Sequence, residues 1–535
     1  MQHKWRKRVL FGFGVAVVCL MIILESFHPS LTNIQYRKYQ DNLKEGLLFK
    51  PVNDTNCIYT LDGRIDRDLE GNFVIPQDDI LKLLPYHIAE CLFRRYTTTL
   101  QTYCAKRSHH GQLEHSWNFC IDGCYKPNSY TKVIAFSIRD DYPNAYGLSV
   151  FFNSTAYRFS PRDSMKTKND VMFKLKSRNK NADTRRLWTM DGIKDFLKST
   201  NMKQHILIID AEHYTDLIIT KIFKTRIVDE IHQISVRLTN EDNIKVDYKP
   251  ILCKLRRFYD HGFRIFWFDL DYSCVSRIDR KRTNCMQIDM IHKDCKDSWK
   301  LFKVEHSHVL IPENDFQLKN MRADEIEQFM SLRYLTSIQM HCKEIIRLGN
   351  IKDGGWEVCN DIRFRPRHPC LVYSFGINWD WGFDEEVVET YDCEVHSFDP
   401  SMIYSGKRPN IHFHRIGLIN KRNFYDFKRK WNMTTLDDIR TTLGHAARKI
   451  DILKIDIEWD EWIVLPNVIK TGVLKYVTQI LLELHSPGNL ERMKTVRSLY
   501  NEGFRIFWYH RNHFCRRNKA YIEYSICFEV CFVRI

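Results

Sequence analysis

The sequence predicts two α/β domains in tandem, each built on a doubly wound, largely parallel sheet, after an N-terminal membrane helix. Three observations favour this: a long internal repeat, an alternation of strand-like and helical runs, and an uncharged apolar stretch near the N-terminus. The chain has 535 residues, which is too many for a single hydrophobic core. At 44% hydrophobic residues, its composition is that of a globular protein.

The N-terminal segment predicts the compartment. Basic residues, among them Lys4 and Arg8, precede an apolar stretch without charge at 9–24. We expect residues 1–8 to stay in the cytoplasm, 9–26 to span the membrane as a signal anchor, and 27–69 to form a stem. A cleaved signal peptide is the alternative. In both cases the rest of the chain would face the lumen of the endoplasmic reticulum or Golgi, or the outside.

The cysteine and charge content agree with that compartment. The chain has 17 cysteines, and its sequons at Asn53, Asn153 and Asn432 would be glycosylated there. The net charge of +15 indicates either an acidic partner, such as a glycan or lipid, or a generally basic surface. A nucleic acid is a further acidic partner that such a charge allows, but no long Lys/Arg block stands out, and we expect no nucleic acid partner.

Several blocks repeat in the same order along the chain. The clearest pair is HGFRIFWFDLDYSC at 261–274 and EGFRIFWYHRNHFC at 502–515. Another is HILIIDAEHYTDLII at 205–219 and DILKIDIEWDEWIVL at 451–465. The period is far too long for a solenoid, so we predict two whole domains, at 70–300 and 306–535.

Four cysteines recur in each copy: Cys104, Cys120, Cys274 and Cys285 in the first, and Cys342, Cys359, Cys515 and Cys527 in the second. The last two of each set flank an expected hairpin, which favours a disulfide within each such pair. Each set allows three connectivities. A zinc site is the alternative, although no Cys-x-x-Cys pair is present.

The second copy alternates strands with helices. Strands are expected at 371–377, 393–400, 411–418, 451–458, 479–485 and 504–510, and helices at 434–449, 460–471 and 489–501. Thr434 or Thr435 would cap the first of these helices. The run at 524–533 would be an edge strand. This alternation predicts an open, mostly parallel sheet.

In such sheets ligands bind at the carboxyl ends of the strands, beside the point where strand order reverses. The residues expected there are Gly376, Asp399, Asp456, Glu458, Glu483 and His485. Gly376 would let a ligand approach the backbone, and Asp399 would accept hydrogen bonds from a ribose diol. Asp456 and Glu458 would share one face, because side chains alternate along a strand, and would hold a cation or accept a proton. A turn glycine and helix-capping carboxylates are the simpler interpretations.

Four motifs, GGWEVCND, PCLVYSFGI, CEVHSFDPS and LKIDIEWDEW, resemble the animal methyltransferase-like protein 24 family and, more distantly, FkbM-type methyltransferases. The resemblance covers about 306–535 and, more faintly, 70–300. It implies two tandem Rossmann-like S-adenosylmethionine methyltransferase-type domains, each with a seven-stranded sheet and an antiparallel last hairpin. It further implies roles at five positions that bind S-adenosyl-L-methionine: Ser374, Phe375 and Gly376 at its amino-acid end, Asp399 at its ribose, and Asp456 facing cofactor or substrate. Trp459 stands where FkbM-type motifs carry glycine.

The first copy departs from this pattern. Arg139 falls near the glycine position, and Asn153 or Ser154 falls near the position of the ribose-binding carboxylate, whereas Asp210 and Glu212 retain the acidic pair. A cationic side chain and a missing carboxylate would impair cofactor binding. We therefore predict that the first copy is degenerate and serves as a scaffold or a substrate-binding half.

The expected reaction is methylation of a hydroxyl group on a glycan, a lipid or a secretory protein, catalysed by the second copy. A hydroxyl acceptor requires a general base, for which Glu458, Glu483 and His485 are the candidates; His485 titrates nearest to neutral pH. No metal is assigned to this site. One alternative is a luminal glycosyltransferase that uses Asp269 and Asp271 on a metal ion. The other is a catalytically decayed, membrane-tethered binding protein.

Overall fold

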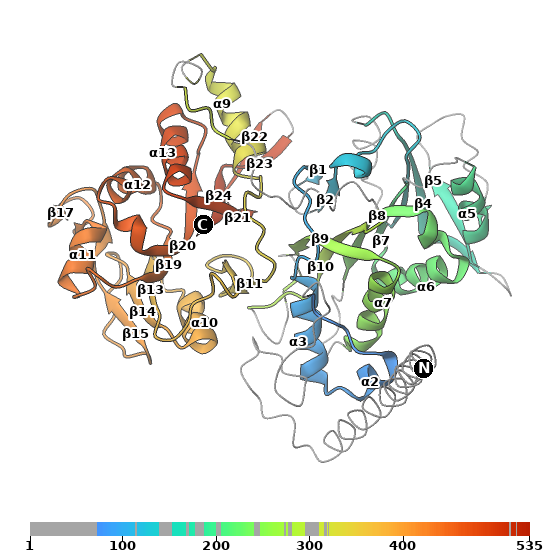
Figure 1. Ribbon diagram of the computed structural model, residues 1–535, viewed down its shortest axis with the longest axis horizontal. Helices are drawn as coiled ribbons and strands as arrows, with labels where there is room; N and C mark the ends of the chain where they lie inside the picture. Colours follow the sequence, from blue (N-terminus) through green and yellow to red (C-terminus); the bar gives the residue numbers. More distant parts are fainter. Residues whose placement is uncertain are drawn as a thin grey trace, which may run out of the picture. The chain divides into compact units, whose positions relative to one another are not determined.

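The computed structural model describes most of the chain from residue 72 onward, with one large sheet in each copy (Figure 1). The described residues are 72–112, 115–138, 152–166, 171–176, 187–199, 205–239, 247–271, 274–275, 281–294, 310–314, 318, 320–512, 515–519 and 522–535. The expected membrane helix at 9–26 and stem at 27–69 lie outside them. Within the described part of the chain, no helix combines the length and the apolar composition needed to cross a bilayer.

The C-terminal sheet has seven strands in the order β15-β14-β13-β19-β20-β24-β21. Their bounds are Ile411–His414 (β15), Glu394–Phe398 (β14), Leu371–Phe375 (β13), Ile450–Ile455 (β19), Val477–His485 (β20), Cys527–Arg534 (β24) and Phe504–Arg511 (β21). The first five are parallel, and β24 runs antiparallel to both of its neighbours. Strand order reverses between β13 and β19. The predicted α/β class with a mostly parallel sheet is confirmed.

The last strand of the chain is not the edge strand that we expected at 524–533. β24 lies between β20 and β21, and nearly all of its side chains are buried. A strand that is apolar on both faces needs covered faces and paired neighbours, whereas β21 has half-buried polar residues at its end and takes the edge.

Four helices connect the C-terminal strands: α10 (Gly382–Tyr391), α11 (Leu436–Thr442), α12 (Glu461–Lys470) and α13 (Leu490–Asn501). Thr435 caps α11, because its side chain accepts a hydrogen bond from the backbone N–H of Asp438. The helix ends at Thr442 and not at 449, since Gly444 has a φ of +73° and its N–H bonds back to Thr441.

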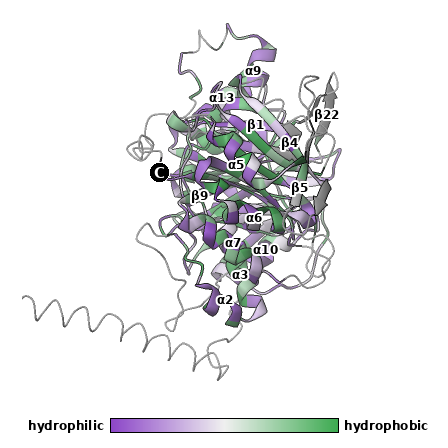
Figure 2. Cartoon of the chain, turned by 90° about the vertical axis from the view of Figure 1, so that its right-hand side faces the viewer, coloured by the Kyte–Doolittle hydropathy of each residue, from purple (hydrophilic) through white to green (hydrophobic). Residues whose placement is uncertain are grey.

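The core of the C-terminal domain is continuous between the sheet and its helices. Tyr373, Phe375 and Ile455 of the sheet belong to the same buried cluster as Val464 of α12 and Val496 of α13. In the N-terminal copy, α5 (Met190–Lys198) and α7 (Lys249–Asp260) mix hydrophilic and hydrophobic residues (Figure 2). Their buried residues, Met190, Ile193 and Leu197 in α5 and Leu252, Leu255 and Phe258 in α7, recur at the spacing of one helix face.

The expected strand at 411–418 is divided in two. β15 ends at His414, and Gly417–Leu418 form β16, which joins a small sheet with β18 (Trp431–Thr434) and β17 (Phe424–Asp426). The N–H of Ile416 bonds back to the carbonyl of His414, a tight turn that takes the chain out of the large sheet.

The N-terminal sheet has eight strands in the order β6-β5-β4-β3-β7-β8-β10-β9. Their bounds are Leu187–Trp188 (β6), Val171–Lys176 (β5), Thr155–Lys166 (β4), Lys132–Ser137 (β3), His205–Asp210 (β7), Ile231–Leu238 (β8), Met286–His292 (β10) and Phe263–Leu270 (β9). From β4 to β9 the order matches that from β14 to β21, with β10 antiparallel like β24. The antiparallel strands β5 and β6 stand where the other sheet has β15.

The register of the N-terminal sheet corrects the expected counterpart of Asp399. Phe136 pairs with Phe159 in the way that Phe375 pairs with Phe398. The residue after Phe159 is Ser160, so this serine, and not Asn153 or Ser154, occupies the position of the carboxylate. The run at 149–155 was misleading because β4 begins only at Thr155.

The same register corrects the counterpart of Gly376. Ser137 follows Phe136 as Gly376 follows Phe375, so Ser137 holds the glycine position. Arg139, which we expected there, lies outside the described residues. The conclusion that the first copy lacks the carboxylate is unchanged, although a different residue carries it.

The recurrent cysteines pair identically in the two copies. Cys104–Cys120 and Cys274–Cys285 form disulfides in the first, and Cys342–Cys359 and Cys515–Cys527 form them in the second. A further disulfide, Cys370–Cys393, joins the starts of β13 and β14. The predicted pairing of the last two cysteines of each set is confirmed.

Candidate active site

A cavity of about 1390 Å³ opens at the carboxyl ends of the C-terminal strands. All eight side chains expected there line it: Ser374, Phe375, Gly376, Asp399, Asp456, Glu458, Glu483 and His485. They come from the ends of β13, β14, β19 and β20, on both sides of the point where strand order reverses. A crevice opens outside the strand ends at such a point, which is why residues up to 111 positions apart in the chain line one cavity.

Gly376 is required by the backbone that faces it. Its φ is +80°, and a Cβ atom added to it would lie 1.6 Å from the carbonyl oxygen of Asp456. The close approach that we expected is therefore made by the end of β19 and not by a ligand. Any side chain at this position would separate β13 from β19 at the mouth of the cavity.

Asp399 holds two loops together at the end of β14. Its Oδ2 accepts a hydrogen bond from the backbone N–H of Asn378 at 2.8 Å, and its Oδ1 accepts from the N–H and the hydroxyl of Ser401 at 2.8 and 2.6 Å. A carboxylate has about four lone-pair positions. Three are used, so one position remains for a ligand hydroxyl.

Ser374 and Phe375 are buried on β13 beside the cavity. Phe375 stacks on Phe398 at a ring distance of 4.4 Å, which fixes β13 against β14. Ser374 lies near Asp384 of α10, whose other partner is the Ser397 hydroxyl at 2.7 Å. Burial raises the pKa of Asp384 to about 6, against the lowering effect of the Ser397 hydrogen bond.

Lys454 is a buried cation under the cavity floor, and we did not predict it. Its Nζ donates to the carbonyl oxygens of Phe375 and Gly376 at 3.3 and 3.0 Å and lies 3.7 Å from Oδ2 of Asp456. It therefore ties the ends of β13 and β19 together and balances the charge of Asp456. A lysine within the otherwise apolar run ILKI (452–455) was the signal that sequence reasoning passed over.

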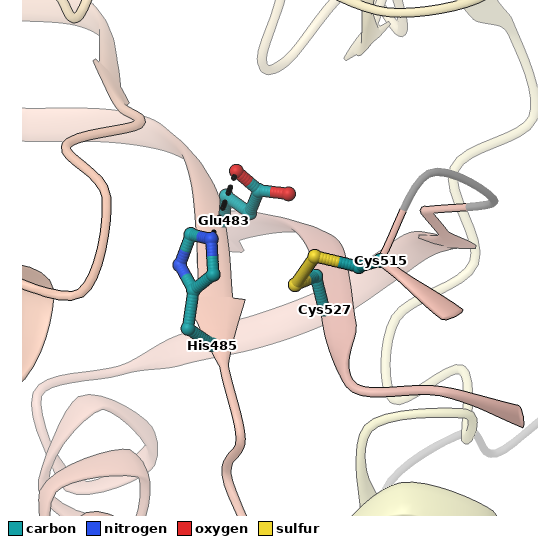
Figure 3. A group of neighbouring side chains, drawn as sticks. All are labelled: Glu483, His485, Cys515 and Cys527. Atoms are coloured by element: carbon teal, nitrogen blue, oxygen red, sulfur yellow. Dashed lines mark ion pairs between the residues drawn. A yellow bond between two sulfur atoms is a disulfide. The ribbon is translucent and has the colours of Figure 1, made fainter. Parts of the chain in front are cut away.

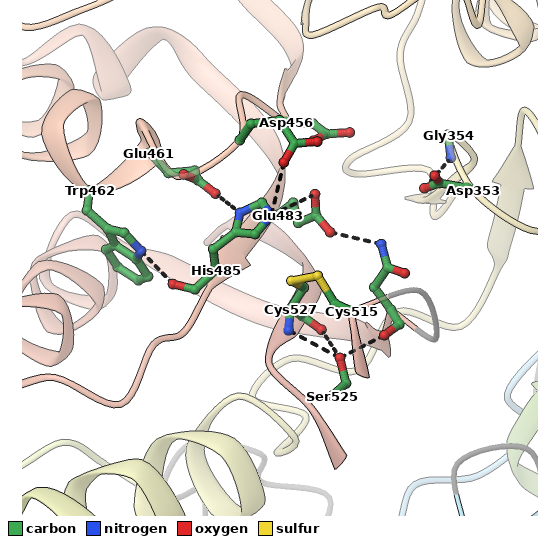
Figure 4. A network of polar contacts seen from close by, with 12 residues as sticks. Asp353, Gly354, Asp456, Glu461, Trp462, Glu483, His485, Cys515, Ser525 and Cys527 are labelled. Atoms are coloured by element: carbon green, nitrogen blue, oxygen red, sulfur yellow. Dashed lines mark hydrogen bonds and ion pairs between the residues drawn. A yellow bond between two sulfur atoms is a disulfide. The ribbon is translucent and has the colours of Figure 1, made fainter. Parts of the chain in front are cut away.

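His485 and Glu461 form a buried pair at the other side of the cavity (Figure 4). The Nδ1 of His485 is hydrogen bonded to Oε1 of Glu461, which lies in the first turn of α12 and is fully buried. The Nε2 lies 3.6 Å from Glu458 and 3.7 Å from Glu483. One ring nitrogen is thus held by a carboxylate, and the other faces the cavity carboxyl groups.

The charges around His485 favour its protonated form. Burial acts to lower its pKa, but the hydrogen bond to Glu461 and the charges of Glu461, Glu458 and Asp456 outweigh it, so that the pKa is raised. A carboxylate that orients a histidine and raises its basicity is the arrangement of a general base and its positioning residue. Glu461 gave no signal in the sequence, because an acidic residue at a helix start usually serves only the helix dipole.

Glu483 is suited to donate a proton and not to accept one. Burial, followed by the charge of Asp456 and a hydrogen bond with it, raises the pKa of Glu483 to about 10. Its Oε1 accepts a hydrogen bond from Nδ2 of Asn512 at 2.9 Å. At neutral pH the carboxyl group is therefore neutral. Of the three bases that we expected, Glu483 fits that role least.

The turn after β19 carries Glu458 in a strained conformation. Glu458 and Trp459 have φ values of +53° and +77°, so the strand ends at Ile455 and the expected period-two alternation does not extend to Glu458. Trp459 thus has the conformation that glycine adopts in related motifs. The Glu458 side chain is exposed, yet desolvation by the surrounding cavity wall and the neighbouring charge of Asp456 raise its pKa. Strain of this kind is concentrated at functional sites.

Asn378 and Trp379 repeat this strain in the loop after β13, with φ values of +42° and +67°. Trp379 and Trp459 are exposed, whereas Trp381 is buried. The Trp459 ring lies 5.0 Å from that of His485. An exposed aromatic ring next to the candidate base gives an acceptor molecule a surface to contact.

The Cys515–Cys527 disulfide lies beside Glu483 and His485 (Figure 3). With free thiolates, these four residues would resemble a tetrahedral metal site. The disulfide occupies both sulfur atoms, so the cysteines are not metal ligands here. They instead fix the end of β24 against the cavity wall.

The pair Asp269 and Asp271 lies elsewhere, at the end of β9 in the N-terminal domain. Asp269 accepts a hydrogen bond from Nδ2 of Asn118 at 2.8 Å, and the same Asn118 contacts Asp289. Burial raises the pKa of Asp269 to about 6 and that of Asp289 to about 8. This is a buried polar network within the sheet and not an open acidic pair that binds a metal–nucleotide complex.

A family model described as a methyltransferase domain matches residues 288–534. The chain is 32% identical over 175 residues to the human probable methyltransferase-like protein 24, and 31% identical over 174 residues to that of Rattus norvegicus. The C-terminal domain is thus similar to the methyltransferase-like protein 24 family. The human match covers 30% of this chain and 47% of the relative, and the rat match covers 29% and 46%, so the chain spans under half the length of the relatives it matches.

The chain also shows a weak likeness to a solved structure. Phosphoethanolamine N-methyltransferase 2 of Haemonchus contortus, in complex with S-adenosyl-L-methionine, is 11% identical, with 66% of this chain and 70% of that chain covered. The TM-score is 0.18, and we base nothing on it.

Proposed function

We propose that the C-terminal domain is an S-adenosyl-L-methionine-dependent methyltransferase that acts on a hydroxyl group. The match to a methyltransferase domain and the similarity to methyltransferase-like protein 24 support the reaction class. The observation that carries the proposal is the joint placement of Asp399 and the His485–Glu461 pair on one cavity at the switch point of the sheet. When bound there, S-adenosyl-L-methionine supplies an electrophilic methyl group on its sulfonium.

The residues present fit this cofactor. Asp399 retains one acceptor position for a ribose hydroxyl, beside a glycine that only the backbone of Asp456 crowds. Asp456 and Glu458 provide negative charge near the position of a cationic ligand. The cavity of about 1390 Å³ has room for the cofactor and part of an acceptor.

His485 is the candidate base for the acceptor hydroxyl. Its Nε2 faces the cavity, while Glu461 holds Nδ1 and stabilises the positive charge that the ring gains on taking a proton. Glu483, neutral at neutral pH, donates a hydrogen bond in the same region. Glu458 is exposed at the rim and contacts His485 from the solvent side.

The N-terminal domain supports the proposal by contrast. Strand register matches Ser160 with Asp399, Ile208 with Lys454, Arg237 with Glu483 and Thr239 with His485. The N-terminal domain retains the turn after β7 that corresponds to the turn after β19, since Glu212 has a positive φ of +46°, as Glu458 does. The backbone is retained, but the side chains at the positions of Asp399, Lys454, Glu483 and His485 are not. We therefore infer a tandem duplication whose first domain is a degenerate scaffold.

We place the two domains in the secretory pathway, tethered by residues 9–26, where the acceptor is a glycan, a lipid or a secretory protein. Disulfides in both domains support an oxidising compartment. Asn432 is exposed on β18 and open to glycosylation. Endoglycosidase treatment of the full chain tests this: a mobility shift that Asn432→Gln reduces is expected, and a chain without glycans contradicts it.

A calorimetric titration of the full chain with S-adenosylhomocysteine tests the proposed function. We expect binding that Asp399→Ala weakens at least tenfold and that Ser160→Ala, the matched change in the N-terminal domain, leaves intact. Loss of one charged hydrogen-bond network costs about 1.5–3 kcal/mol, or about tenfold to a hundredfold in affinity. Failure of the unaltered chain to bind, or binding of a UDP-sugar with Mn²⁺ in its place, would overturn the assignment.

A further inference from the structure

A cluster of histidines lies at the end of β14 opposite to Asp399. Glu394 and His396 alternate along β14, and His412 and His414 alternate along β15, so that each pair points to one face of the sheet. The parallel register places His396 directly beside His412. Their rings lie 5.0 Å apart. The proposed methyltransferase chemistry uses none of these side chains.

Three of them are placed to share one ion. A ligand atom from each of Glu394, His396 and His412 lies within 4.8 Å of the other two. A tetrahedral ion with bonds of about 2.1 Å holds its ligands about 3.4 Å apart. Small side-chain rotations would therefore bring the three ligand atoms to the spacing that coordination requires. Because His412 is exposed and His396 is buried, an ion would arrive from solvent and be held against the sheet.

Two of the three side chains, His396 and Glu394, have shifted pKa values. Burial, together with the charge of His414, lowers the pKa of His396 to about 4, against a smaller opposing effect of Glu394. Burial likewise lowers the pKa of His414 and His445. Burial acts to raise the pKa of Glu394, but hydrogen bonds from His396 and Arg448 outweigh it and lower the pKa to about 2. Neutral imidazoles and an ionised carboxylate are the forms that bind metals.

We propose that Glu394, His396 and His412 form a binding site for Zn²⁺ or a similar divalent transition metal. Imidazole and carboxylate ligands suit such ions. Two ligands come from alternate positions of one strand and one from its neighbour, which makes the site rigid. Three protein ligands leave the fourth position to water or to an exogenous group.

The residues around the cluster supply the contacts that metal ligands need. Nε2 of His396 now bonds Oε1 of Glu394 at 2.9 Å, and its Nδ1 bonds Nε2 of His414 at 2.9 Å. An ion would replace the proton between His396 and Glu394, and the His396 ring would then donate its Nδ1–H to His414. Arg448 holds the second oxygen of Glu394 at 2.8 Å. Such outer contacts fix the orientation and tautomer of metal ligands.

His445 is not counted as a ligand, because both of its ring nitrogens are engaged. Its Nδ1 bonds the Tyr373 hydroxyl at 2.8 Å, and its Nε2 lies 3.1 Å from Nη1 of Arg448. This contact places the guanidinium beside Glu394. His445 thus positions Arg448, and the cluster extends from the exposed edge of the sheet to the buried Tyr373.

Titration of the metal-free full chain with Zn²⁺ alone tests the site. We expect one equivalent bound with micromolar affinity, and at least tenfold weaker binding in His412→Ala and in Glu394→Gln. His412 is exposed, so its removal should not impair folding. His368→Ala removes another exposed histidine of the same domain and is the matched control.

Co²⁺ gives an independent readout, since its visible absorption reports a low-coordinate site with nitrogen ligands. We expect that absorption in the unaltered chain and in His368→Ala, and its loss in His412→Ala. No Zn²⁺ binding, or binding that His412→Ala leaves unchanged, would overturn the proposal. S-adenosylhomocysteine affinity is expected to stay the same in His412→Ala, so that this test is separate from that of the methyltransferase site.

Discussion

The fully buried carboxylate of Glu461 is hydrogen bonded to Nδ1 of His485, whose Nε2 faces the cavity. This pair raises the pKa of His485 against the effect of burial. A histidine that binds its proton more tightly when folded stabilises the fold fully below its unfolded pKa of about 6.5. That stabilisation is lost as the pH rises through the raised folded value.

The first prediction follows for Glu461→Gln. Without the carboxylate, the pKa of His485 falls, so the variant should lose most stability at pH 6 and progressively less toward pH 9. Unfolding midpoints of the full chain at these pH values measure the effect, with the exposed Glu491→Gln as control. An equal loss at every pH would show that Glu461 contributes only packing.

Glu483→Gln should stabilise the protein. The native state keeps a proton on Glu483 up to about pH 10, whereas the unfolded chain releases it near pH 4.5. Between these values the native state is penalised more as the pH rises, and a neutral glutamine removes that penalty while keeping the acceptor for Asn512. We expect a gain of about 1–3 kcal/mol at pH 8.

Chemical denaturation of the two proteins at pH 5 and pH 8 checks this prediction. The difference between Glu483→Gln and the unaltered chain should be larger at pH 8. A destabilised glutamine variant at pH 8 would mean that Glu483 is ionised in the fold and paired with a cation.

Lys454→Met should destabilise the C-terminal domain and weaken cofactor binding. The change removes the Lys454 donor from the carbonyl oxygens of Phe375 and Gly376, of which Phe375 keeps the N–H of Asp456. It also leaves Asp456 without the cation 3.7 Å away. Breaking a buried charge pair costs about 3–5 kcal/mol. The matched change is Ile208→Met, at the equivalent position of β7, which should cost less than about 1.5 kcal/mol.

Unfolding midpoints and S-adenosylhomocysteine titrations of both variants give the comparison. If Lys454→Met is as stable as Ile208→Met, the lysine does not hold the strand ends together. If it is unstable but binds S-adenosylhomocysteine normally after correction for the folded fraction, its role is structural alone.

The sequence predicted the strands and the residues at their ends because both signals are local. Apolar runs mark β13, β19 and β20, and polar residues directly after them mark the cavity. The order of β24 within the sheet is not local: nothing in its own residues says which strands it pairs with. The expected match of Asn153 or Ser154 with Asp399 was wrong for a similar reason. Only the pairing of β4 with β3 shows that Ser160 matches Asp399.

The side-chain contacts across the cavity could not be predicted either, because they depend on which elements pack together and not on the local sequence. Glu461 and His485 are separated by 24 residues and meet only because α12 packs beside β20. Lys454 was visible as a charge in an apolar strand, but the carbonyl groups that it contacts were not. The histidines of β14 and β15 carried a period-two pattern, yet their meaning depended on knowing that these strands are neighbours.

The last prediction concerns Gly376, where both the positive φ and the space argue for glycine. A Cβ atom there would lie 1.6 Å from the carbonyl oxygen of Asp456, so β13 and β19 would have to separate at the cavity. Gly472 is the matched control, because its φ is +68° but no atom lies within 4 Å of an added Cβ. Gly472→Ala should cost only the backbone strain of about 1–2 kcal/mol.

We expect Gly376→Ala to cost at least about 3 kcal/mol, because strand separation adds to the same backbone strain. S-adenosylhomocysteine binding should be lost in Gly376→Ala and unchanged in Gly472→Ala, since only the first moves Asp456 and the end of β13. Denaturation midpoints and calorimetry of both alanine variants measure these effects. Equal costs for the two glycines would mean that the strand ends adapt freely, and that the cavity does not depend on their close approach.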